Sequence, residues 1–349
     1  MINLTVKNYN LVFKRPAGTS RGVLKTKPSY FLMLHDSQNE NKISIGECGI
    51  LPGLSYDDKP GYEKKLEELK SVINSTQKVD IDLDLDKWPS IRFGLEILIK
   101  DYYSKSDKVL FPTAFTQGQY KIPINGLIWM GERQFMFNQI KTKIDEGWSC
   151  IKMKIGAIDF KEELELLKFI RTQFKPSELE LRVDANGAFA PENALEKLKY
   201  LSDYSIHSIE QPIKANQIDK MAELCDISPI PIALDEELIG IFDYSNKKEL
   251  IRKIKPQFII LKPSLIGGWK ASSEWIQIAK ENNVKYWATS ALESNIGLNA
   301  IAQWTATLEK DLVHGLGTGQ LYTNNFQSPL IASKGFLSYQ KDKNWSIQL

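Results

Sequence analysis

The chain has 349 residues, of which 25% are charged and 42% hydrophobic, and its formal net charge is +2. This length allows one or two domains with a sizeable core, and the composition is that of an ordinary globular protein. Charge is nearly balanced and the lysines interleave with acids, as in Lys161-Glu162-Glu163, so nothing supports a nucleic-acid partner.

The cysteines and the N-terminal residues indicate where in the cell the protein is expected and whether it contacts a membrane. Cys48, Cys150 and Cys225 are odd in number and have no CxxC spacing, which disfavours a disulfide framework and a zinc site. The first residues lack the apolar segment of a signal peptide, and no apolar run approaches membrane-spanning length. We therefore expect a cytoplasmic protein without a membrane partner.

Residues 1–115 are predicted to form an α+β capping domain. Segments rich in β-branched and aromatic residues predict antiparallel strands at 2–12, 30–35 and 43–46. Two glycine-containing segments, 18–24 and 46–55, are predicted to be loops, and the second is unusually apolar for a loop. Helices are expected at 58–74 and 89–103.

From about residue 119, short apolar strands alternate with amphipathic helices. Strands are predicted at 120–125, 150–155, 179–184, 208–211, 230–235, 258–262, 284–289 and 312–315. Helices are predicted between them at 131–146, 159–173, 191–202, 215–226, 243–254, 269–281 and 295–308. This alternation favours a parallel sheet that is buried on both faces. We predict an α/β fold, a modified TIM (β/α)7β barrel over 116–319, with a tail at 320–349 that returns to the capping domain.

The second barrel strand carries two lysines on one face. In Ile151-Lys152-Met153-Lys154-Ile155, period-two alternation points both lysines the same way. On a solvated edge strand this is ordinary. Inside a barrel, two neighbouring ammonium groups disfavour each other's charge, which suits an amine that acts as a base. The pentapeptide alone leaves both alternatives open.

Polar residues also end the later strands, one βα unit apart. Asp184, Glu210, Asp235, Lys262 and Ser290 therefore arrive at the carboxyl-terminal mouth of the barrel, where such folds place their active sites. Taken singly, each acid could instead cap the next helix or turn. Three converging carboxylates need a cation to be tolerated. An oxygen-only ligand set fits Mg²⁺, with Mn²⁺ able to substitute, rather than Zn²⁺.

Lysines flank these acids on both sides of the mouth. Lys152 and Lys154 lie on the second strand and Lys262 on the sixth, across the barrel. A small-molecule carboxylate substrate held on the metal would then have an amine at either face. This arrangement suits removal of a proton from the carbon next to the carboxylate, with the metal and an ammonium group stabilising the enediolate.

The Lys-x-Lys pair, the Asp, Glu, Asp series and the later lysine resemble the enolase superfamily, in its muconate-lactonising subgroup. The resemblance covers nearly the whole chain, including the cap and the tail. Finer segments are similar to a dehydratase family of that subgroup: Gly46-Glu47-Cys48, Arg182-Val183-Asp184-Ala185-Asn186-Gly187, Lys262-Pro263-Ser264-Leu265-Ile266-Gly267-Gly268 and Ser290-Ala291-Leu292-Glu293-Ser294-Asn295-Ile296-Gly297. Mandelate racemase-like members would carry a histidine on strand seven, where this chain has Ser290.

The resemblance implies a syn elimination of water from 2-succinyl-6-hydroxy-2,4-cyclohexadiene-1-carboxylate in menaquinone biosynthesis. Lys154 would remove the α-proton and deliver it to the departing hydroxyl, Lys152 would hold the carboxylate, and Lys262 would face the ring. Asp184, Glu210 and Asp235 would bind the metal. The residues expected at the substrate are Ser290, Glu293, Ser294, Arg21, Asn125, Arg182, Leu51 and Leu54. The loops at 18–24 and 48–55 would fold over the mouth and exclude water.

Two alternatives stay open. An N-acylamino acid racemase or related epimerase has the same two-lysine architecture and uses both amines as bases. Dipeptide epimerases typically carry Asp-x-Asp on strand eight, where this chain has Gly315-Leu316-Gly317-Thr318-Gly319. The second alternative is a metal-binding barrel that has lost catalysis, although such a scaffold would have no use for paired buried amines. The sequence makes no prediction of the oligomeric state.

Overall fold

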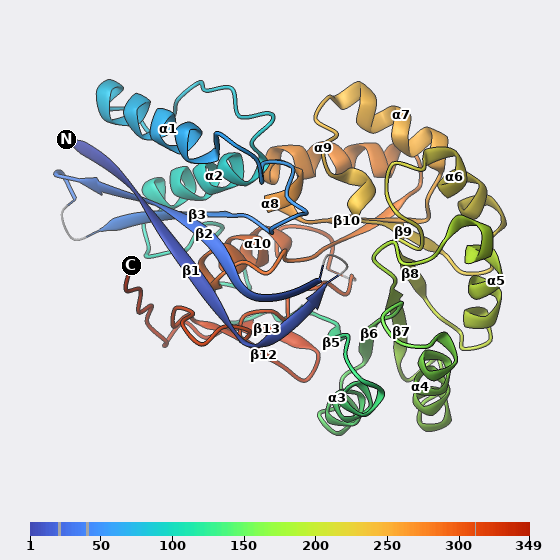
Figure 1. Ribbon diagram of the computed structural model, residues 1–349. Helices are drawn as coiled ribbons and strands as arrows, with labels where there is room; N and C mark the ends of the chain where they lie inside the picture. Colours follow the sequence, from blue (N-terminus) through green and yellow to red (C-terminus); the bar gives the residue numbers. More distant parts are fainter. Residues whose placement is uncertain (20–21, 40–41, 311) are drawn as a thin grey trace.

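The computed structural model describes residues 1–349 except 20–21, 40–41 and 311, and it begins with an antiparallel sheet in the order β1-β2-β3 (Figure 1). Its strands are β1 (Ile2–Thr19), β2 (Gly22–Asp36) and β3 (Ile43–Gly49). The first two form one long hairpin whose register shifts between Val12 and Ala17. The predicted loop at 18–24 is therefore wrong in its described part, because Gly18 pairs with Val23.

Both predicted helices are present, as α1 (Tyr62–Thr76), which begins later than predicted, and α2 (Pro89–Tyr103), and they pack on this sheet (Figure 1). Their apolar sides enclose a separate small core with Leu4, Leu32 and Leu34 of the sheet. Strand β3 and helix α2 approach so closely that a Cβ added at Gly46 would lie 2.0 Å from the carbonyl oxygen of Gly94. Only glycine is compatible with that approach.

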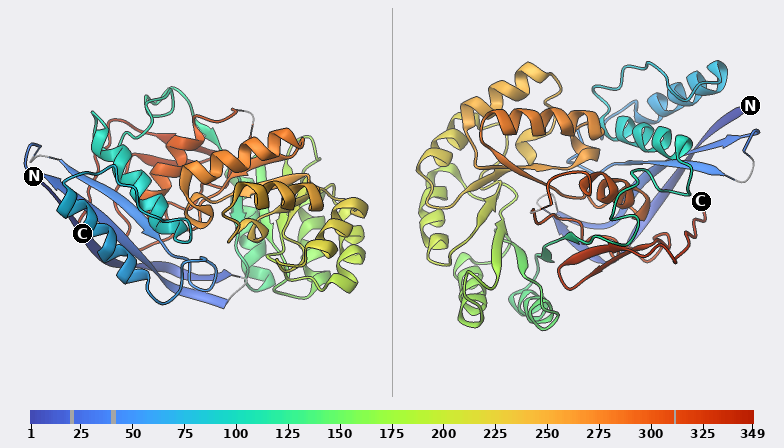
Figure 2. Two further views of the ribbon diagram at one scale, coloured as in Figure 1. Left: turned by 90° about the horizontal axis from the view of Figure 1, so that it is seen from above. Right: turned by 180° about the vertical axis from the view of Figure 1, so that it is seen from behind.

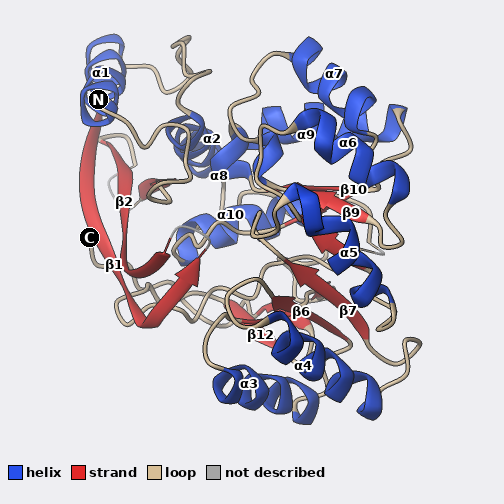
Figure 3. Cartoon of the chain, turned by 45° about the vertical axis from the view of Figure 1, so that its right-hand side comes forward, coloured by secondary structure: helices blue, strands red, loops and turns tan. Residues whose placement is uncertain are grey.

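Seven parallel strands form the second sheet, in the order β11-β10-β9-β8-β7-β6-β5. They are β5 (Gly126–Ile128), β6 (Cys150–Lys154), β7 (Glu180–Asp184), β8 (Ser208–Glu210), β9 (Ile232–Leu234), β10 (Phe258–Leu261) and β11 (Lys285–Ala288). The helices between and after them are α3 (Arg133–Asp145), α4 (Phe160–Gln173), α5 (Pro191–Ser202), α6 (Ile218–Ile227), α7 (Tyr244–Ile254), α8 (Pro263–Ile266), α9 (Gly268–Glu281) and α10 (Asn295–Thr305), with a 3₁₀ turn, η1 (Glu236–Leu238), after β9. Figure 3 shows α3 to α7 and α9 outside the curled sheet, which confirms the predicted α/β barrel class.

The two predicted strands at the ends of the barrel series differ from the structure. The segment predicted at 120–125 contains β4 (Ile122–Pro123), which pairs with the tail, and the first barrel strand is β5 instead. The eighth strand, predicted at 312–315, is reduced to isolated bridges from Ile124 to His314 and from Thr289 to Gly315. A glycine-rich segment is a weak strand, which accounts for the reduced eighth strand.

The tail forms β12 (Leu330–Ser333) and β13 (Phe336–Tyr339), and Figure 2 shows it beside the first sheet. Phe13 bridges to Tyr322, and the last residues pack against Phe31 and Ile45 of the capping sheet. The predicted return to the cap is therefore found. Near the end of the chain, Ser346 makes an isolated bridge to Gln327. The boundaries proposed at 115 and 319 stay a prediction.

Among the residues that the structure describes, no helix has both the length and the apolar character needed to span a membrane. All three cysteines are free and buried.

Candidate active site

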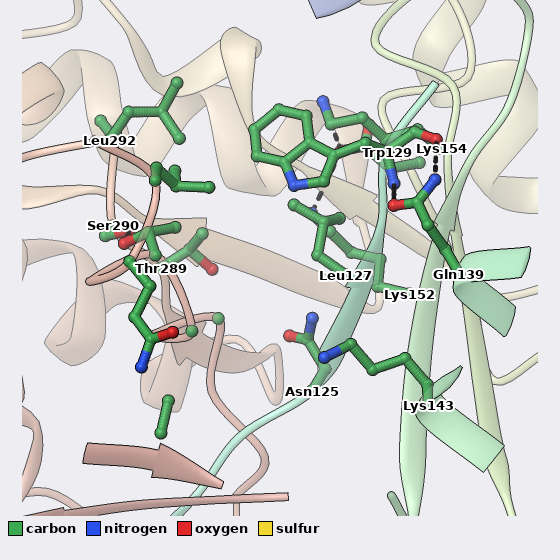
Figure 4. A pocket seen from close by; sticks show the side chains of 18 of the residues that line it. Asn125, Leu127, Trp129, Gln139, Lys143, Lys152, Lys154, Thr289, Ser290 and Leu292 are labelled. Carbon is green, nitrogen blue, oxygen red and sulfur yellow. Dashed lines mark hydrogen bonds and ion pairs between the residues drawn. The ribbon is translucent and has the colours of Figure 1, made fainter. Parts of the chain in front are cut away.

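A cavity of about 820 Å³ opens at the carboxyl ends of the barrel strands. This volume is within the range of small-molecule sites, about 300–1,000 Å³. Figure 4 shows Lys152 and Lys154 on one side of it and Ser290 and Leu292 on the other. Residues of the cap, among them Leu51 and Leu54, complete the lining. The alternation of β6 and the common direction of the strands bring these side chains together.

Three lysines and three carboxylates form a buried cluster at the floor of the cavity. The Nζ atom of Lys152 lies 3.1 Å from Asp184 Oδ2 and 2.6 Å from Glu210 Oε2. On the opposite side, the Nζ atom of Lys262 bonds to Asp235 and lies 3.5 Å from Glu210 Oε1. Each of these two ammonium groups thus bridges the carboxylates that end neighbouring strands.

Burial and charge act in opposite directions on the pKa values of this cluster. Burial alone would raise the pKa of Asp184, but the nearby lysines outweigh it and hold that pKa well below the usual range. Burial, helped by the charge of Asp184, raises the pKa of Glu210 to about 7. For Lys152 and Lys262, burial would lower the pKa, but the carboxylates outweigh it and raise both. The expectation that a neighbouring lysine disfavours the charged amine therefore does not hold for Lys152, since the carboxylates stabilise its charge, as they do for Lys262.

Lys154 has a different environment. Its Nζ atom donates to Asn186 Oδ1 at 2.6 Å and lies 3.5 Å from Asp184 Oδ2. Asn186 in turn donates to Glu236 Oε1 at 3.2 Å. Asn186 has a left-handed backbone with φ of 44°, a conformation that asparagine tolerates better than most residues. Sequence reasoning did not single out Asn186 or Glu236, although Asn186 stands only two residues after Asp184.

Some of the residues predicted to contact the substrate line the cavity, and others do not. Asn125, Ser290, Leu51 and Leu54 line the cavity, and Ser290 Oγ shares a hydrogen bond of 2.6 Å with Thr318 Oγ1. Arg21 lies outside the described residues. The position of the cap loop at 51–54 agrees with its predicted placement over the mouth.

The position of Arg182 disfavours the substrate contact predicted for it. Its Nε donates to Glu180 Oε1 at 2.6 Å and its NH1 to the carbonyl oxygen of Val313 at 3.0 Å, and its guanidinium lies over the ring of Trp287. Every second side chain of a barrel strand points into the barrel, and each lies one layer away from the next. Arg182 stands two residues before Asp184 and therefore lies one layer below it. It fills the barrel interior beneath the cavity.

Glu293 and Ser294 belong to a buried polar network between cap and barrel. Glu47 of β3 accepts from the backbone N–H of Ser294 at 2.9 Å, from that of Gly297 at 2.8 Å, and from Ser294 Oγ at 2.5 Å. Glu293 accepts from the hydroxyl of Ser264 and from the N–H of Ala291 at 2.8 Å. Both side chains are committed to these contacts and do not line the cavity, so a direct substrate contact does not fit their positions.

The three strand-end acids have the donor chemistry of a metal site but are held by lysines in this structure. Within the described ranges, no three His, Cys, Asp or Glu side chains already stand as a ligand set, and Lys152 and Lys262 bridge the three carboxylates instead. The donors are nevertheless oxygen only and wholly buried, and Glu210 Oε1 has no hydrogen-bond partner. Such a set fits a hard divalent cation, provided that the lysine side chains shift from the carboxylates.

Comparison with known proteins identifies the relatives of this chain. Residues 136–343 match the family model described as "Enolase C-terminal domain-like". An o-succinylbenzoate synthase from Desulfotalea psychrophila (strain LSv54 / DSM 12343) is 45% identical over 366 residues, covering 96% of this chain and 98% of the relative. The crystal structure of MenC from Desulfotalea psychrophila LSv54 is similar with a TM-score of 0.84 at 40% identity, covering 97% of this chain and 99% of the other.

Epimerases are more distant relatives. An L-amino acid-D/L-Glu epimerase from Sulfurimonas denitrificans (strain ATCC 33889 / DSM 1251) is 25% identical over 317 residues, which cover 86% of this chain and 87% of the relative. The identity to the synthase is thus much higher than the identity to this epimerase and extends over more of the chain.

Proposed function

We propose a function from the premise that the chain belongs to the enolase superfamily and, within it, to the o-succinylbenzoate synthase family. It is a hydro-lyase that converts 2-succinyl-6-hydroxy-2,4-cyclohexadiene-1-carboxylate to o-succinylbenzoate in menaquinone biosynthesis. The observation that carries the proposal is the placement of Lys154 and Lys262 around the buried carboxylates of one cavity. An amine on either side of a bound carboxylate suits an elimination that starts with loss of the α-proton.

In this proposal Lys154 moves the proton. Its Nζ atom takes the α-proton of the substrate and then gives a proton to the departing hydroxyl on the same face, which makes the elimination syn. Asn186, 2.6 Å from that nitrogen, holds the side chain in place. Because the product is aromatic, the reaction itself is strongly favoured, and the protein mainly has to stabilise one anionic intermediate.

Lys152 and Lys262 supply positive charge. Lys152 holds the substrate carboxylate, and Lys262 faces the ring, where its ammonium offsets the negative charge that develops when the proton leaves. Asp184, Glu210 and Asp235 would hold Mg²⁺, or Mn²⁺ in its place, and a bound divalent cation would supply further stabilisation of that charge. Leu51 and Leu54 exclude water above the ring. A small-molecule carboxylate partner and a cytoplasmic location, which fits the free cysteines, belong to the same proposal.

The test is a spectroscopic dehydration assay with the cyclohexadiene substrate, run beside a racemisation assay with N-succinyl amino acids. We expect fast dehydration by the native chain and its loss in Lys154→Ala, while Lys161→Ala on the exposed side of α4 keeps full activity. Mg²⁺ binding should survive in Lys154→Ala. Fast racemisation without dehydration would refute the proposal, and dehydration that survives in Lys154→Ala would refute the assignment of the base.

A further inference from the structure

The wall of the barrel is incomplete beside β5. Strand β5 is the edge of the seven-stranded sheet, and in the described chain the closure to the glycine-rich segment at 315–319 rests on the bridges of Ile124 and Thr289. A Cβ built on Gly317 would lie 3.7 Å from the carbonyl oxygen of Asn125, so a larger side chain there would have room beside the start of β5. We use the name seam for this boundary between β5 and residues 315–319.

The cavity extends through the seam to the outer face of β5. Asn125 and Leu127 line it from within the barrel, whereas Lys143 of α3 and Trp148 line it from the helix side. Figure 4 shows Lys143 running from α3 toward Asn125. The stem of Lys143 passes Gly126, where an added Cβ would be 2.9 Å from Lys143 Cδ. The absent side chain of Gly126 therefore makes room for a helix lysine to reach the seam.

Two buried polar side chains that line the cavity near the seam each have an oxygen atom without a hydrogen-bond partner. Asn125 and Thr289 are 4% and 8% exposed, and both line the cavity. Neither Asn125 Oδ1 nor Thr289 Oγ1 has a partner. Buried polar groups are normally satisfied, so these two atoms, which lie at a cavity wall, indicate that a polar part of a ligand belongs there. The hydroxyl of Thr289 can donate to an anion. The Oδ1 atom of Asn125 only accepts, so an anion there would be bound by the NH2 group of the same amide.

The charge at the outer end of the seam is suited to an anion. Lys143 Nζ lies 3.3 Å from Glu146 Oε2 and 4.2 Å from the centre of the Trp148 ring. The indole N–H of Trp148 also donates to Glu146, at 2.7 Å. An ammonium group has three donors, and Glu146 uses one of them. Lys143 can therefore bind a second carboxylate while it keeps this pair.

We propose that the seam is the subsite for the terminal carboxylate of the succinyl arm, bound by Lys143, with the amide NH2 group of Asn125 and the hydroxyl of Thr289 as neutral donors. The proposal rests on the proposed function, because that substrate and its product each carry a second carboxylate. The position is suitable, since Gly126 and Leu127 pair with Ile151 and Lys152 of the strand that carries the catalytic lysines. The seam therefore lies directly beside the strand that carries these lysines.

The experiment compares two aromatic acids on the Mg²⁺-loaded enzyme. The first is o-succinylbenzoate, and the second is 2-butanoylbenzoate, in which a methyl group replaces the terminal carboxylate. Calorimetric titration of the wild type should show about tenfold tighter binding of the diacid, as expected for one charge-assisted hydrogen bond. Lys143→Met keeps the apolar stem and should bring the two affinities close together by weakening only the diacid.

Matched variants separate this site from others. Lys141→Met lies on the same helix with an exposed side chain and should leave the preference for the diacid unchanged. Asn125→Leu should reduce it. Arg15 lines the same cavity from the cap; if Arg15→Met abolishes the preference and Lys143→Met does not, the seam is not the subsite.

Failure of the subsite can be told from failure of the proposed function. A wild type that dehydrates the substrate and binds both acids equally overturns the subsite and leaves the function standing. A wild type that binds neither acid and dehydrates nothing overturns both.

Discussion

Glu47 should contribute more to stability than any surface acid of the cap, and replacing it with alanine tests this. Its side chain is fully buried and accepts from two backbone N–H groups at the start of α10 and from the hydroxyls of Ser29 and Ser294. Lys27, also fully buried, is the nearby compensating cation, and burial lowers its pKa against the opposing effect of Glu47 and Glu293. The substitution removes four acceptor contacts and half of the balancing negative charge.

The expected loss in the free energy of unfolding is about 3–5 kcal/mol, the usual cost of removing one partner of a buried charge pair. The unpaired N–H groups of Ser294 and Gly297 alone would account for about 1–3 kcal/mol each if water could not reach them. Glu47→Gln keeps one acceptor oxygen and loses the charge, so it should cost roughly 1.5–3 kcal/mol, the range for hydrogen bonds to charged groups.

Urea unfolding followed by circular dichroism measures both variants. Glu68→Ala is the control, because Glu68 is half exposed and only pairs with Lys65 at 3.1 Å, and it should change stability by less than about 0.5 kcal/mol. If Glu47→Ala cost no more than this control, the buried network would not hold the cap to the barrel, and the physical reasoning for Glu47 would be refuted.

Three further predictions concern the site and the barrel core. Glycine at position 186 tolerates the left-handed backbone but cannot hold Lys154, so Asn186→Gly should lower kcat about tenfold or more. KM and Mg²⁺ affinity should change little. An equal loss of kcat in Asn193→Gly, at an exposed position, would contradict this role of Asn186. Burial, with a nearby Arg182, lowers the pKa of His314 from 6.5 to about 3, so only the unfolded chain binds this proton between those values. The free energy of unfolding should therefore fall as the pH drops below about 6.5, by up to about 1.4 kcal/mol per pH unit. His314→Gln should remove this contribution to the pH dependence. If urea unfolding at several pH values gave the same pH dependence for the variant and the native chain, the role of His314 would be disproved. Chelation of divalent metal should abolish dehydration and Mg²⁺ should restore it, whereas rescue by zinc alone would contradict the oxygen-ligand assignment.

Local periodicity was enough to predict the barrel class and the central residues of the cavity. Alternation on β6 predicted that Lys152 and Lys154 share a face, and the spacing of βα units predicted that Asp184 and Lys262 reach the same mouth. Both are properties of short segments, and parallel strands place all their carboxyl ends on one side. The family resemblance, now established by the relatives, depended on these same positions.

The positions of other candidate residues depend on depth in the barrel or on distant partners. Arg182 belongs to the same motif as Asp184 but lies one layer deeper, against Glu180 and Trp287. Glu293 follows a cavity-lining loop, yet its carboxylate turns to Ser264. Sequence adjacency gives the order of residues along a strand or loop, and it does not say which layer of a filled barrel each side chain occupies.

The sequence by itself determined the alternating elements, the strand-end acids and the lysines, because hydrophobic periodicity and chain direction are local properties. Only the tertiary structure decided that β4 pairs with the tail and that β5 is an edge strand of the barrel sheet. It also decided that Lys143, from a helix, reaches the cavity past Gly126. These features depend on contacts between segments far apart in the chain, and such contacts leave no periodic trace in the sequence.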